Sequence, residues 1–537
     1  MNRYWRPRLP FFFVLLPILT GCPAMSPLAA IDPSGPIQAW AVPGLERVRP
    51  DAPPQDNMPI ELYAARGEYE SFQVIVAGAR GLRGVDLQVS DLSGPNGAVI
   101  SKDNLTLYRE HYVLVDKSSP YKGGTSRPEG TGWYPDALIP FNSSVRPQFA
   151  ANQVVYGSVP VDVIPGNNQA FWVDIFVPRD AKPGLYKGQY TISSSNGQVK
   201  GEVRLNVWNF ELPLKPSLQS FAPLWFTRTP AAKIELLRNR IQPGRVQPKQ
   251  VAELREYGLN LIELGIGAGA SYHTCTATPA PSPDEFRQAK EARVGPNSDI
   301  PVYDFAFDEV DNCNLGQAMR EWGRSMHEAG VLHLATVMPT PELLDDGTGR
   351  PAVDVFVLNS EMYEQVKANG MLEAARAKGA KIWYYAALVR GKTPDAPNWQ
   401  LDYSPMNFRI SSGFFAQALG FSGILDWAAD HVTKGQDPWQ SVSYVEDQVT
   451  YQADGLLAYP GDRVGLPGTV VPSMRLKWLR DGAEDYEYVE LLKKRPELYA
   501  KMAWMVQRLV PGLQTWNRDP AKLEATRREI GKALSGQ

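Results

Sequence analysis

The chain has 537 residues, which is more than one typical domain and predicts about two or three. Its formal net charge of −3, without a block of like charge, gives no reason to expect nucleic acid or an anionic membrane surface as a partner. The sequence is rich in aromatic residues, with 14 Trp and 23 Tyr. Aromatic rings suit sugar-binding clefts, although most of them are expected to pack the core.

The first 22 residues predict a bacterial lipoprotein signal peptide. Three arginines precede an apolar run at 9–19, which is short for a membrane span, and LTGC follows at 19–22. We expect Cys22 to be lipidated, which would anchor an exported protein in the cell envelope. Pro23 rather than Asp follows, which favours the outer membrane in a Gram-negative cell. The alternative is an ordinary signal peptide cleaved near Ala29-Ala30.

Residues 23–35 are interpreted as a tether, and residues 36–213 as a β-sandwich domain. Short segments of alternating apolar and polar residues fill the second range, separated by Gly, Pro, Asn and Asp. Seven or more such strands without a helical pattern are typical of a sandwich. The long loop at 121–140, rich in Gly and Pro, is long enough to reach toward a second domain.

Strands and helices alternate over residues 214–495, which predicts a (β/α)8 barrel, with a doubly wound sheet as the alternative. Residues 496–537 are interpreted as closing helices. The eight candidate strands are 218–226, 259–266, 301–308, 331–337, 352–358, 381–387, 421–427 and 455–459.

Polar and aromatic side chains gather at the predicted strand ends, where the chemistry of a barrel lies. The strand at 301–308 ends in the adjacent acids Asp308 and Glu309. Four aromatic residues near other strand ends are predicted substrate contacts: Trp225, Tyr385, Trp427 and Tyr459.

The adjacent acids predict either a structural ion pair or a catalytic pair. Neighbouring strand residues point to opposite faces, so both can face one substrate only if the strand ends or bulges there. They cannot easily straddle a sugar ring as a nucleophile and an acid do. Such a pair suits a reaction in which the substrate's 2-acetamido group attacks the anomeric carbon. Asp308 would then orient that amide, and Glu309 would be the acid and base.

The remaining motifs give weaker evidence of function. The GxGxG at 265–269 lacks the following helix of a dinucleotide site, and the five His residues have no metal-binding spacing. We therefore predict neither a metal nor a cofactor. His431 is a weaker candidate for substrate contact.

Cys275 and Cys313 both follow predicted strands, and export permits a disulfide between them, although the sequence does not show that they meet.

Several segments resemble glycoside hydrolase family 123 and its domain-of-unknown-function 4091 relatives, over nearly the whole mature chain. The most specific is VPSMRLKWLRDGAEDYEYVELL at 471–492, whose acidic stretch alone would be interpreted as a solvated helix face. The others are ARGEYESFQVIV at 65–76, AFWVDIFVPRDAKPGLYKGQYTI at 170–192, WYYAAL at 383–388, GILDWAAD at 423–430, DPW at 437–439 and LLAYPG at 456–461.

This resemblance implies a retaining, exo-acting β-N-acetylgalactosaminidase that uses substrate assistance, with a glycan as its substrate. It maps the family's catalytic Asp-Glu pair onto Asp308 and Glu309. The family usually has Pro after the pair, whereas this chain has Val310, which leaves the loop geometry and the sugar open. Two alternatives remain: a glycosidase that needs no acetamido group, and a non-catalytic glycan-binding lipoprotein. The sequence gives no oligomeric state.

Overall fold

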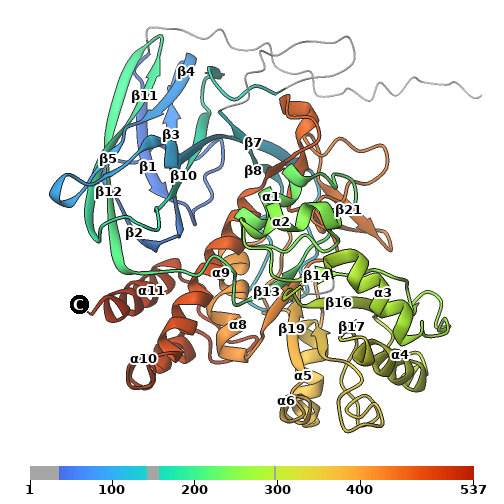
Figure 1. The fold of residues 1–537 in the computed structure, drawn as a ribbon. Helices are drawn as coiled ribbons and strands as arrows, with labels where there is room; N and C mark the ends of the chain where they lie inside the picture. The colour runs from blue at the N-terminus through green and yellow to red at the C-terminus, as the bar shows by residue number, and fades with distance from the viewer. Residues whose placement is uncertain (1–34, 142–155, 296–297, 537) are drawn as a thin grey trace, which may run out of the picture.

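The structure is a computed structural model that describes residues 35–141, 156–295 and 298–536. The predicted signal peptide, Cys22 and nearly all of the predicted tether lie outside these ranges. Across the described ranges, no helix combines the length and the apolar character needed to cross a membrane. The chain forms an N-terminal domain of two sheets and a C-terminal domain of a parallel sheet with helices (Figure 1).

The two N-terminal sheets enclose one hydrophobic core, in which Phe72 and Val173 of one sheet meet Tyr190 and Leu205 of the other. The first sheet is antiparallel, with the order β1 (Gln38–Pro43), β3 (Tyr69–Ala77), β10 (Asn168–Phe176), β7 (Leu105–Val115) and β8 (Gly132–Pro140). The second has the order β2 (Ile60–Arg66), β12 (Gly197–Glu211), β11 (Gly184–Ser194), β4 (Leu82–Val89) and β9 (Val161–Val163); β5 (Leu92–Ser93) also pairs with β11, and β6 (Val99–Ile100) pairs with β5.

The C-terminal domain is built on a parallel half-barrel sheet. Its order is β13 (Gln219–Phe221), β20 (Gly423–Leu425), β19 (Lys381–Tyr385), β18 (Val355–Leu358), β17 (Leu332–Thr336), β16 (Val302–Asp308) and β14 (Ile262–Glu263), and β15 (Ala270–Ser271) also pairs with β16. Seven of the predicted strand segments each contain one of these strands, and only β15 lies outside the predicted segments, so the α/β part of the fold prediction is confirmed in this coarser form.

The predicted (β/α)8 barrel differs from the structure in two respects. The predicted eighth strand forms a separate antiparallel pair of β23 (Ala458–Pro460) with β24 (Val470–Pro472). Between the edge strands β13 and β14 runs an irregular stretch: the Ala222 N–H donates to the Gln242 carbonyl at 3.3 Å, and the Glu263 N–H to the Gly244 carbonyl at 3.2 Å. A second antiparallel pair, β21 (Ser443–Glu446) with β22 (Val449–Gln452), also lies outside the parallel sheet.

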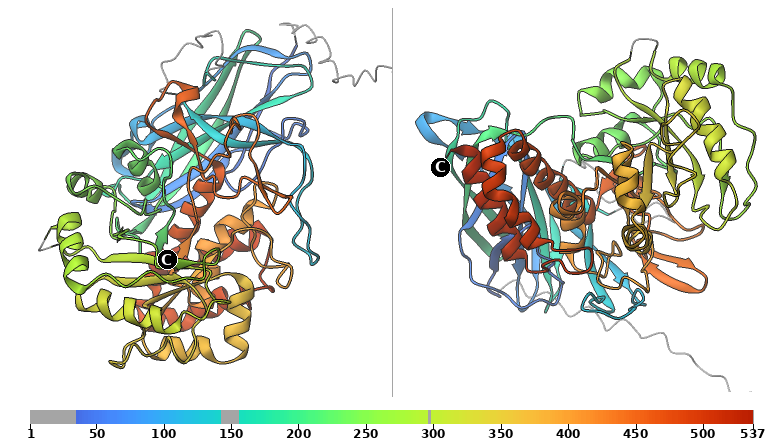
Figure 2. Two further views of the ribbon diagram at one scale, coloured as in Figure 1. Left: turned by 90° about the vertical axis from the view of Figure 1, so that its right-hand side faces the viewer. Right: turned by 90° about the horizontal axis from the view of Figure 1, so that it is seen from below.

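Helices of very different length follow the strands. They are α1 (Pro230–Arg238), α2 (Val251–Arg255), α3 (Pro283–Val294), α4 (Gly316–Glu328), α5 (Ser360–Ala368), α6 (Met371–Ala377), α7 (Pro405–Ser412), α8 (Phe414–Leu419), α9 (Met474–Lys493), α10 (Pro496–Leu509) and α11 (Pro520–Ser535). Seen from below, α10 and α11 pack beside the N-terminal sheets (Figure 2), and α11 contacts β12.

The helix α9 joins the two domains, and its predicted solvated acidic face is wrong. Glu484, Asp485 and Glu487 are all buried. The cations of the same helix pair with carboxylates of the N-terminal sheets. Arg480 Nη1 lies 2.9 Å from Asp174 Oδ2, and Arg475 Nη2 lies 2.8 Å from Asp136 Oδ2.

Charged groups in this helix are buried because other elements supply their partners, as buried ions require. Asp485 accepts from Arg409 Nε at 2.9 Å, and Glu484 pairs with Arg240 at 3.3 Å. The Tyr488 hydroxyl donates to Glu68 at 2.9 Å.

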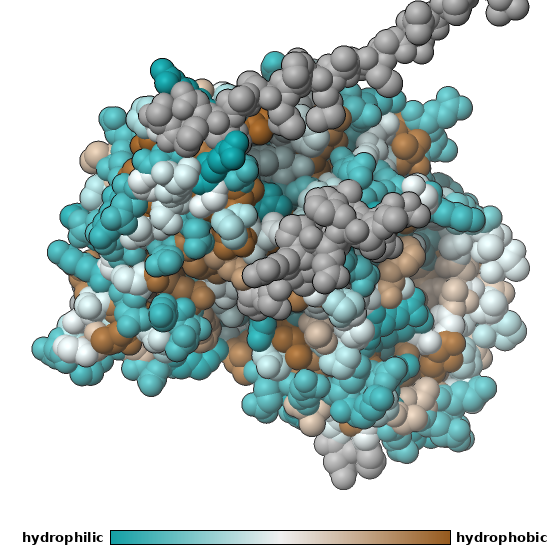
Figure 3. Space-filling model, turned by 90° about the horizontal axis from the view of Figure 1, so that it is seen from above, coloured by the Kyte–Doolittle hydropathy of each residue, from teal (hydrophilic) through white to brown (hydrophobic). Residues whose placement is uncertain are grey.

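The face seen from above is mostly hydrophilic, and hydrophobic residues appear there as separate patches (Figure 3).

Candidate active site

Asp308 and Glu309 line the same pocket because β16 ends between them. Asp308 is the last residue of the strand, and Glu309 has a φ of 51°. A regular strand would point the two side chains to opposite faces, whereas a left-handed residue breaks that alternation. The Glu309 N–H donates to the backbone carbonyl of Thr336 at 2.9 Å, which holds this turn against β17. Val310 then turns into the core, with 2 % of its surface exposed.

The Thr336 hydroxyl connects the two acids. It donates to Asp308 Oδ1 at 2.7 Å and accepts from the Glu309 N–H at 2.8 Å. Burial raises the pKa of Asp308, the Thr336 hydrogen bond lowers it, and the neighbouring charge of Glu309 raises it again. Asp308 is therefore a half-buried carboxyl whose pKa is raised overall, and the Thr336 hydroxyl is the side-chain donor that opposes this rise.

The Glu309 carboxyl is oriented from the opposite side by β19 and the loop after it. The Tyr385 hydroxyl donates to Glu309 Oε1, and Arg390 Nη2 lies 3.6 Å from the same oxygen. Asn359 Nδ2 in turn donates to the Tyr385 hydroxyl at 3.0 Å. Burial, together with the charge of Glu309, raises the pKa of Tyr385 well above its ordinary value. The tyrosine therefore stays protonated and acts as a donor.

The active-site pocket has a volume of about 350 Å³ and aromatic walls. Besides the two acids, Trp225, Tyr272, Tyr385, Trp427 and Tyr444 line it. The rings of Trp225 and Trp427 meet edge to face, with centroids 5.2 Å apart. Three of the four predicted aromatic contacts thus lie in one pocket with the acid pair. Apolar walls with a few converging polar groups are typical of small-ligand sites.

Tyr459 does not line this pocket, so the prediction that it contacts the substrate is wrong. It lies in β23, is fully buried, and its hydroxyl donates to Asp136 at 2.5 Å. The ion pair between Asp136 and Arg475 completes that cluster.

His431 does not line the active-site pocket either. It packs behind it, with its ring centroid 4.7 Å from that of Trp427.

Two buried aspartates hold the aromatic walls in place. Asp454 accepts from the Trp427 indole N–H at 2.7 Å and from the Leu388 N–H at 2.8 Å. Asp430 accepts from three consecutive backbone N–H groups after β13, at 2.6 Å from Trp225, 3.2 Å from Phe226 and 2.7 Å from Thr227. Burial of a carboxylate is tolerated here because several donors surround it.

The structure joins Cys275 and Cys313 in a disulfide, with Cα atoms 5.2 Å apart. Cys275 follows β15 and Cys313 follows β16, so the bond ties together two loops beside the pocket. Tyr272 and His273, three and two residues before the first cysteine, line the pocket.

Among the described residues, no group of three or more His, Cys, Asp or Glu side chains could hold a metal ion.

Sequence reasoning missed several residues of this site. Thr336 lies one residue before the end of a predicted strand and Asn359 follows another, so the strand-end rule that selected Asp308 could also have selected them. Tyr444 and Asp454 had no such signal, because the β21–β22 pair was not predicted and contributes to the site from outside the parallel sheet.

The sequence matches two models of one family. The glycoside hydrolase 123 N-terminal domain matches residues 46–194, and the glycoside hydrolase 123 catalytic domain matches residues 346–492. The second range contains Tyr385, Trp427 and most of α9, and the acid pair precedes it. No curated protein matches the sequence.

Among solved structures, a family 123 glycoside hydrolase from Clostridium perfringens, described for glycolipid glycan hydrolysis, is similar over 93 % of this chain and 98 % of its own. The identity is 14 % and the TM-score 0.64, which shows a shared fold. A β-glucuronidase from Parabacteroides merdae matches at 10 % identity over 74 % of this chain and 48 % of its own, with a TM-score of 0.27. That score is too low to support an argument about fold or function.

Proposed function

The chain belongs to glycoside hydrolase family 123 and is a glycosidase, and from the geometry of its site we propose that it is a retaining exo-β-N-acetylgalactosaminidase with substrate-assisted catalysis. The observation that carries this proposal is the placement of both acids in one pocket. Asp308 and Glu309 are adjacent in the chain, and Thr336 connects them. A nucleophile and an acid on opposite sides of the sugar ring would need carboxylates from separate elements.

In the first step, the carbonyl oxygen of the substrate's 2-acetamido group attacks the anomeric carbon and forms a cyclic oxazolinium ion. The Asp308 carboxylate accepts the amide N–H and stabilises the positive charge that develops on it. Glu309 donates its proton to the glycosidic oxygen, and the leaving sugar departs as an alcohol. The aromatic rings of Trp225 and Trp427 hold the sugar ring.

In the second step, Glu309 is a carboxylate and removes a proton from water, which attacks the anomeric carbon and reopens the ring. Two inversions at that carbon give net retention. Tyr385 and Arg390 contact Glu309 Oε1 and fix the orientation of the carboxyl for both proton transfers.

Substitution of the acid tests this assignment. Glu309→Gln should lower kcat on an unactivated β-N-acetylgalactosaminide by about 10²–10⁴-fold, the usual contribution of a general acid and base. Asp311→Asn is the matched control, since Asp311 lies two residues on, does not line the active-site pocket and accepts from the Met338 N–H at 2.7 Å. Circular dichroism and thermal melting check that both variants fold. Full activity of Glu309→Gln would refute the role of Glu309.

We also propose that the enzyme is an exported lipoprotein anchored through Cys22 in the cell envelope, which in a Gram-negative cell is the outer membrane. The support is the arginine-flanked apolar run followed by LTGC. Cys22→Ser should abolish metabolic labelling with palmitate and move the protein from the membrane fraction to the soluble fraction. Unchanged labelling would contradict a lipid on Cys22.

A further inference from the structure

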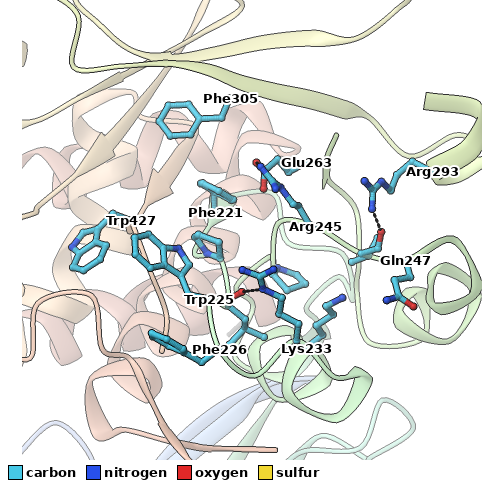
Figure 4. Close-up of a pocket in the computed structure, with 15 residues that line it drawn as sticks. Phe221, Trp225, Phe226, Lys233, Arg245, Gln247, Glu263, Arg293, Phe305 and Trp427 are labelled. Atoms are coloured by element: carbon cyan, nitrogen blue, oxygen red, sulfur yellow. Dashed lines mark hydrogen bonds and ion pairs between the residues drawn. The ribbon is translucent and has the colours of Figure 1, made fainter. Parts of the chain in front are cut away.

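A second pocket adjoins the active-site pocket and shares its aromatic wall. It has a volume of about 530 Å³, and Figure 4 shows the side chains that line it. Phe221, Trp225, Phe305 and Trp427 line both pockets. A glycan that extends past these rings from Asp308 and Glu309 therefore enters the second pocket directly. The irregular stretch between β13 and β14 supplies part of the opposite side.

The opposite side of this second pocket is cationic, and we call it the cationic pocket. Arg228, Lys233, Arg245 and Arg293 line it, whereas Glu263 is the one carboxylate among its lining residues. In Figure 4 the labelled aromatic rings lie on one side of the pocket and Arg245, Arg293 and Lys233 on the other. The lining thus carries an excess of three positive charges, directed at a space large enough for a sugar.

Most of these cations lack an anionic partner. Arg245 Nη2 lies 3.1 Å from Glu263 Oε1. Within the described parts of the chain, Arg228, Lys233 and Arg293 have no carboxylate within 4 Å. Arg228 donates only to the Leu224 carbonyl, at 3.2 Å, and Arg293 donates only to backbone carbonyls, of Val246 and Leu264.

Lys233 is the most informative of these cations because it is buried. Only 3 % of its surface is exposed, and its ammonium donates to the neutral Gln250 Oε1 at 2.8 Å. Burial, reinforced by Arg293 and Arg228, lowers the pKa of Lys233 to about 8. An isolated buried cation is costly, and a bound anion would remove that cost.

We propose that the cationic pocket binds a carboxylate or sulfate group on the sugar that follows the scissile bond, so that the preferred substrate is an acidic glycan. The inference rests on the proposed exo-acting function. The active-site pocket is at the small end of ligand pockets, which suits one terminal sugar. The next sugar then lies past Trp225 and Trp427, where charge-assisted hydrogen bonds from Arg228 and Lys233 reach its acidic substituent.

A matched ligand pair tests the proposal by binding. The first ligand is N-acetylgalactosamine β-linked to glucuronic acid, and the second is its methyl ester, which differs only in the charge. Calorimetry on Glu309→Gln, which should turn the ligands over at least about a hundredfold more slowly than the wild-type enzyme, should give at least about a tenfold lower Kd for the acid. A second pair, with galactose or galactose 6-sulfate as the following sugar, determines whether the pocket takes sulfate as well as carboxylate. Equal Kd values within both pairs would overturn the proposal.

Two further substitutions in that background assign the effect to the pocket. Lys233→Met should remove most of the preference for the acid, and Gln250 Oε1 would still accept from the Gln247 N–H. Arg228→Gln, at an exposed position, should weaken the preference without a packing defect. Lys249→Gln removes an exposed charge that does not line the pocket and is the control. A preference that survives both pocket substitutions, or falls equally in the control, would refute the assignment.

Failure of this inference and failure of the proposed function are distinguishable. Cleavage of the neutral methyl ester by the wild-type enzyme reports on the proposed function alone. Cleavage without a difference in Kd between acid and ester would leave the glycosidase assignment intact and remove the acidic substrate. A difference in Kd without cleavage of either ligand would support the cationic pocket and contradict the proposed activity.

Discussion

A single hydroxyl, that of Thr336, links the two acids on which the proposed reaction depends. It donates to Asp308 and accepts from the backbone of Glu309. The same residue therefore stabilises the charge of one carboxylate and fixes the backbone turn that aims the other. Its side chain is a positioning group, since it is hydrogen-bonded to both acids and nearly fully buried.

Loss of that hydroxyl should move the pH dependence of activity. In the proposed mechanism Asp308 acts as a carboxylate, so activity should be lost as the pH falls through its pKa, which burial already raises. Thr336→Val removes the hydrogen bond that lowers this pKa, and the acid limb of kcat/KM should therefore shift to higher pH. The Glu309 N–H would still donate to the Thr336 carbonyl. Thr336→Ser keeps the hydroxyl and is the control, and a Thr336→Val profile identical to wild type would contradict this role.

At the residue scale, the sequence predicted Asp308 and Glu309 as site residues, because two adjacent acids after a buried strand are an unusual use of charge, and both line one pocket in the structure. It also selected Trp225, Tyr385 and Trp427 by their place at strand ends. It failed for Tyr459, since that choice assumed an eighth parallel strand. The left-handed backbone at Glu309 could not be predicted, because glutamate has no preference for that conformation.

At the scale of single elements, the loop after β13 forms one wall of both pockets and depends on Asp430. Three successive backbone N–H groups, those of residues 225–227, donate to this one carboxylate. The loop carries Trp225, which the two pockets share, and Arg228 follows it directly. Asp430 thus positions both the aromatic wall and part of the cationic pocket.

Asp430→Ala should raise KM more than it lowers kcat, because in the proposed mechanism the loop binds the sugar through Trp225 and does not contact the acid pair. We expect it to lower the free energy of unfolding by about 1–3 kcal/mol, because three part-buried hydrogen bonds to a charged group are lost. Asp430→Asn keeps one acceptor oxygen and should lose less on both measures. Steady-state kinetics with urea unfolding would check this, and an unchanged KM in Asp430→Ala would contradict the role of the loop.

Element type was predictable where strands and helices alternate with clear periodicity. The apolar stripe of α4, for example, contains Met319, Trp322 and Met326, and all three are buried. The β21–β22 and β23–β24 pairs were not predicted, because a short apolar run does not show whether its partner strand is parallel or antiparallel. The irregular stretch at 242–244 was also missed, since it has no strand pattern and is defined only by its hydrogen bonds to both edge strands.

At the scale of the whole molecule, α9 holds the two domains together through buried ion pairs. Its charge pattern favoured a solvated face, because the sequence does not show that Asp136 and Asp174, more than 300 residues earlier, are the partners. Burial alone would raise the pKa of Asp174. The charges of Arg480 and Lys477 outweigh that effect and hold the pKa well below its ordinary value. Stability from this group is therefore present above about pH 4, the unfolded pKa, and is lost as the pH falls toward the folded pKa.

Removal of Asp174 would leave Arg480 and Lys477 buried without their shared partner. Asp174→Ala should therefore lower the free energy of unfolding by about 3–5 kcal/mol, as expected for breaking a buried ion pair. Glu202→Ala breaks a solvent-exposed pair with Arg204 and should have a much smaller effect. Guanidinium unfolding followed by tryptophan fluorescence would measure both variants. Equal effects of the two substitutions would show that α9 does not depend on this pair.

The participation of the substrate's own acetamido group is the central claim, and one rate comparison tests it most directly. The wild-type enzyme is given β-galactosaminides whose N-acetyl group carries zero, one, two or three fluorine atoms, with the same leaving group throughout. Fluorine withdraws electrons from the carbonyl oxygen, which the account makes the nucleophile. The account predicts that kcat falls steeply with each fluorine added, and that the 2-hydroxyl analogue is not cleaved. Equal rates across the series, or cleavage of the 2-hydroxyl analogue at a similar rate, would contradict it.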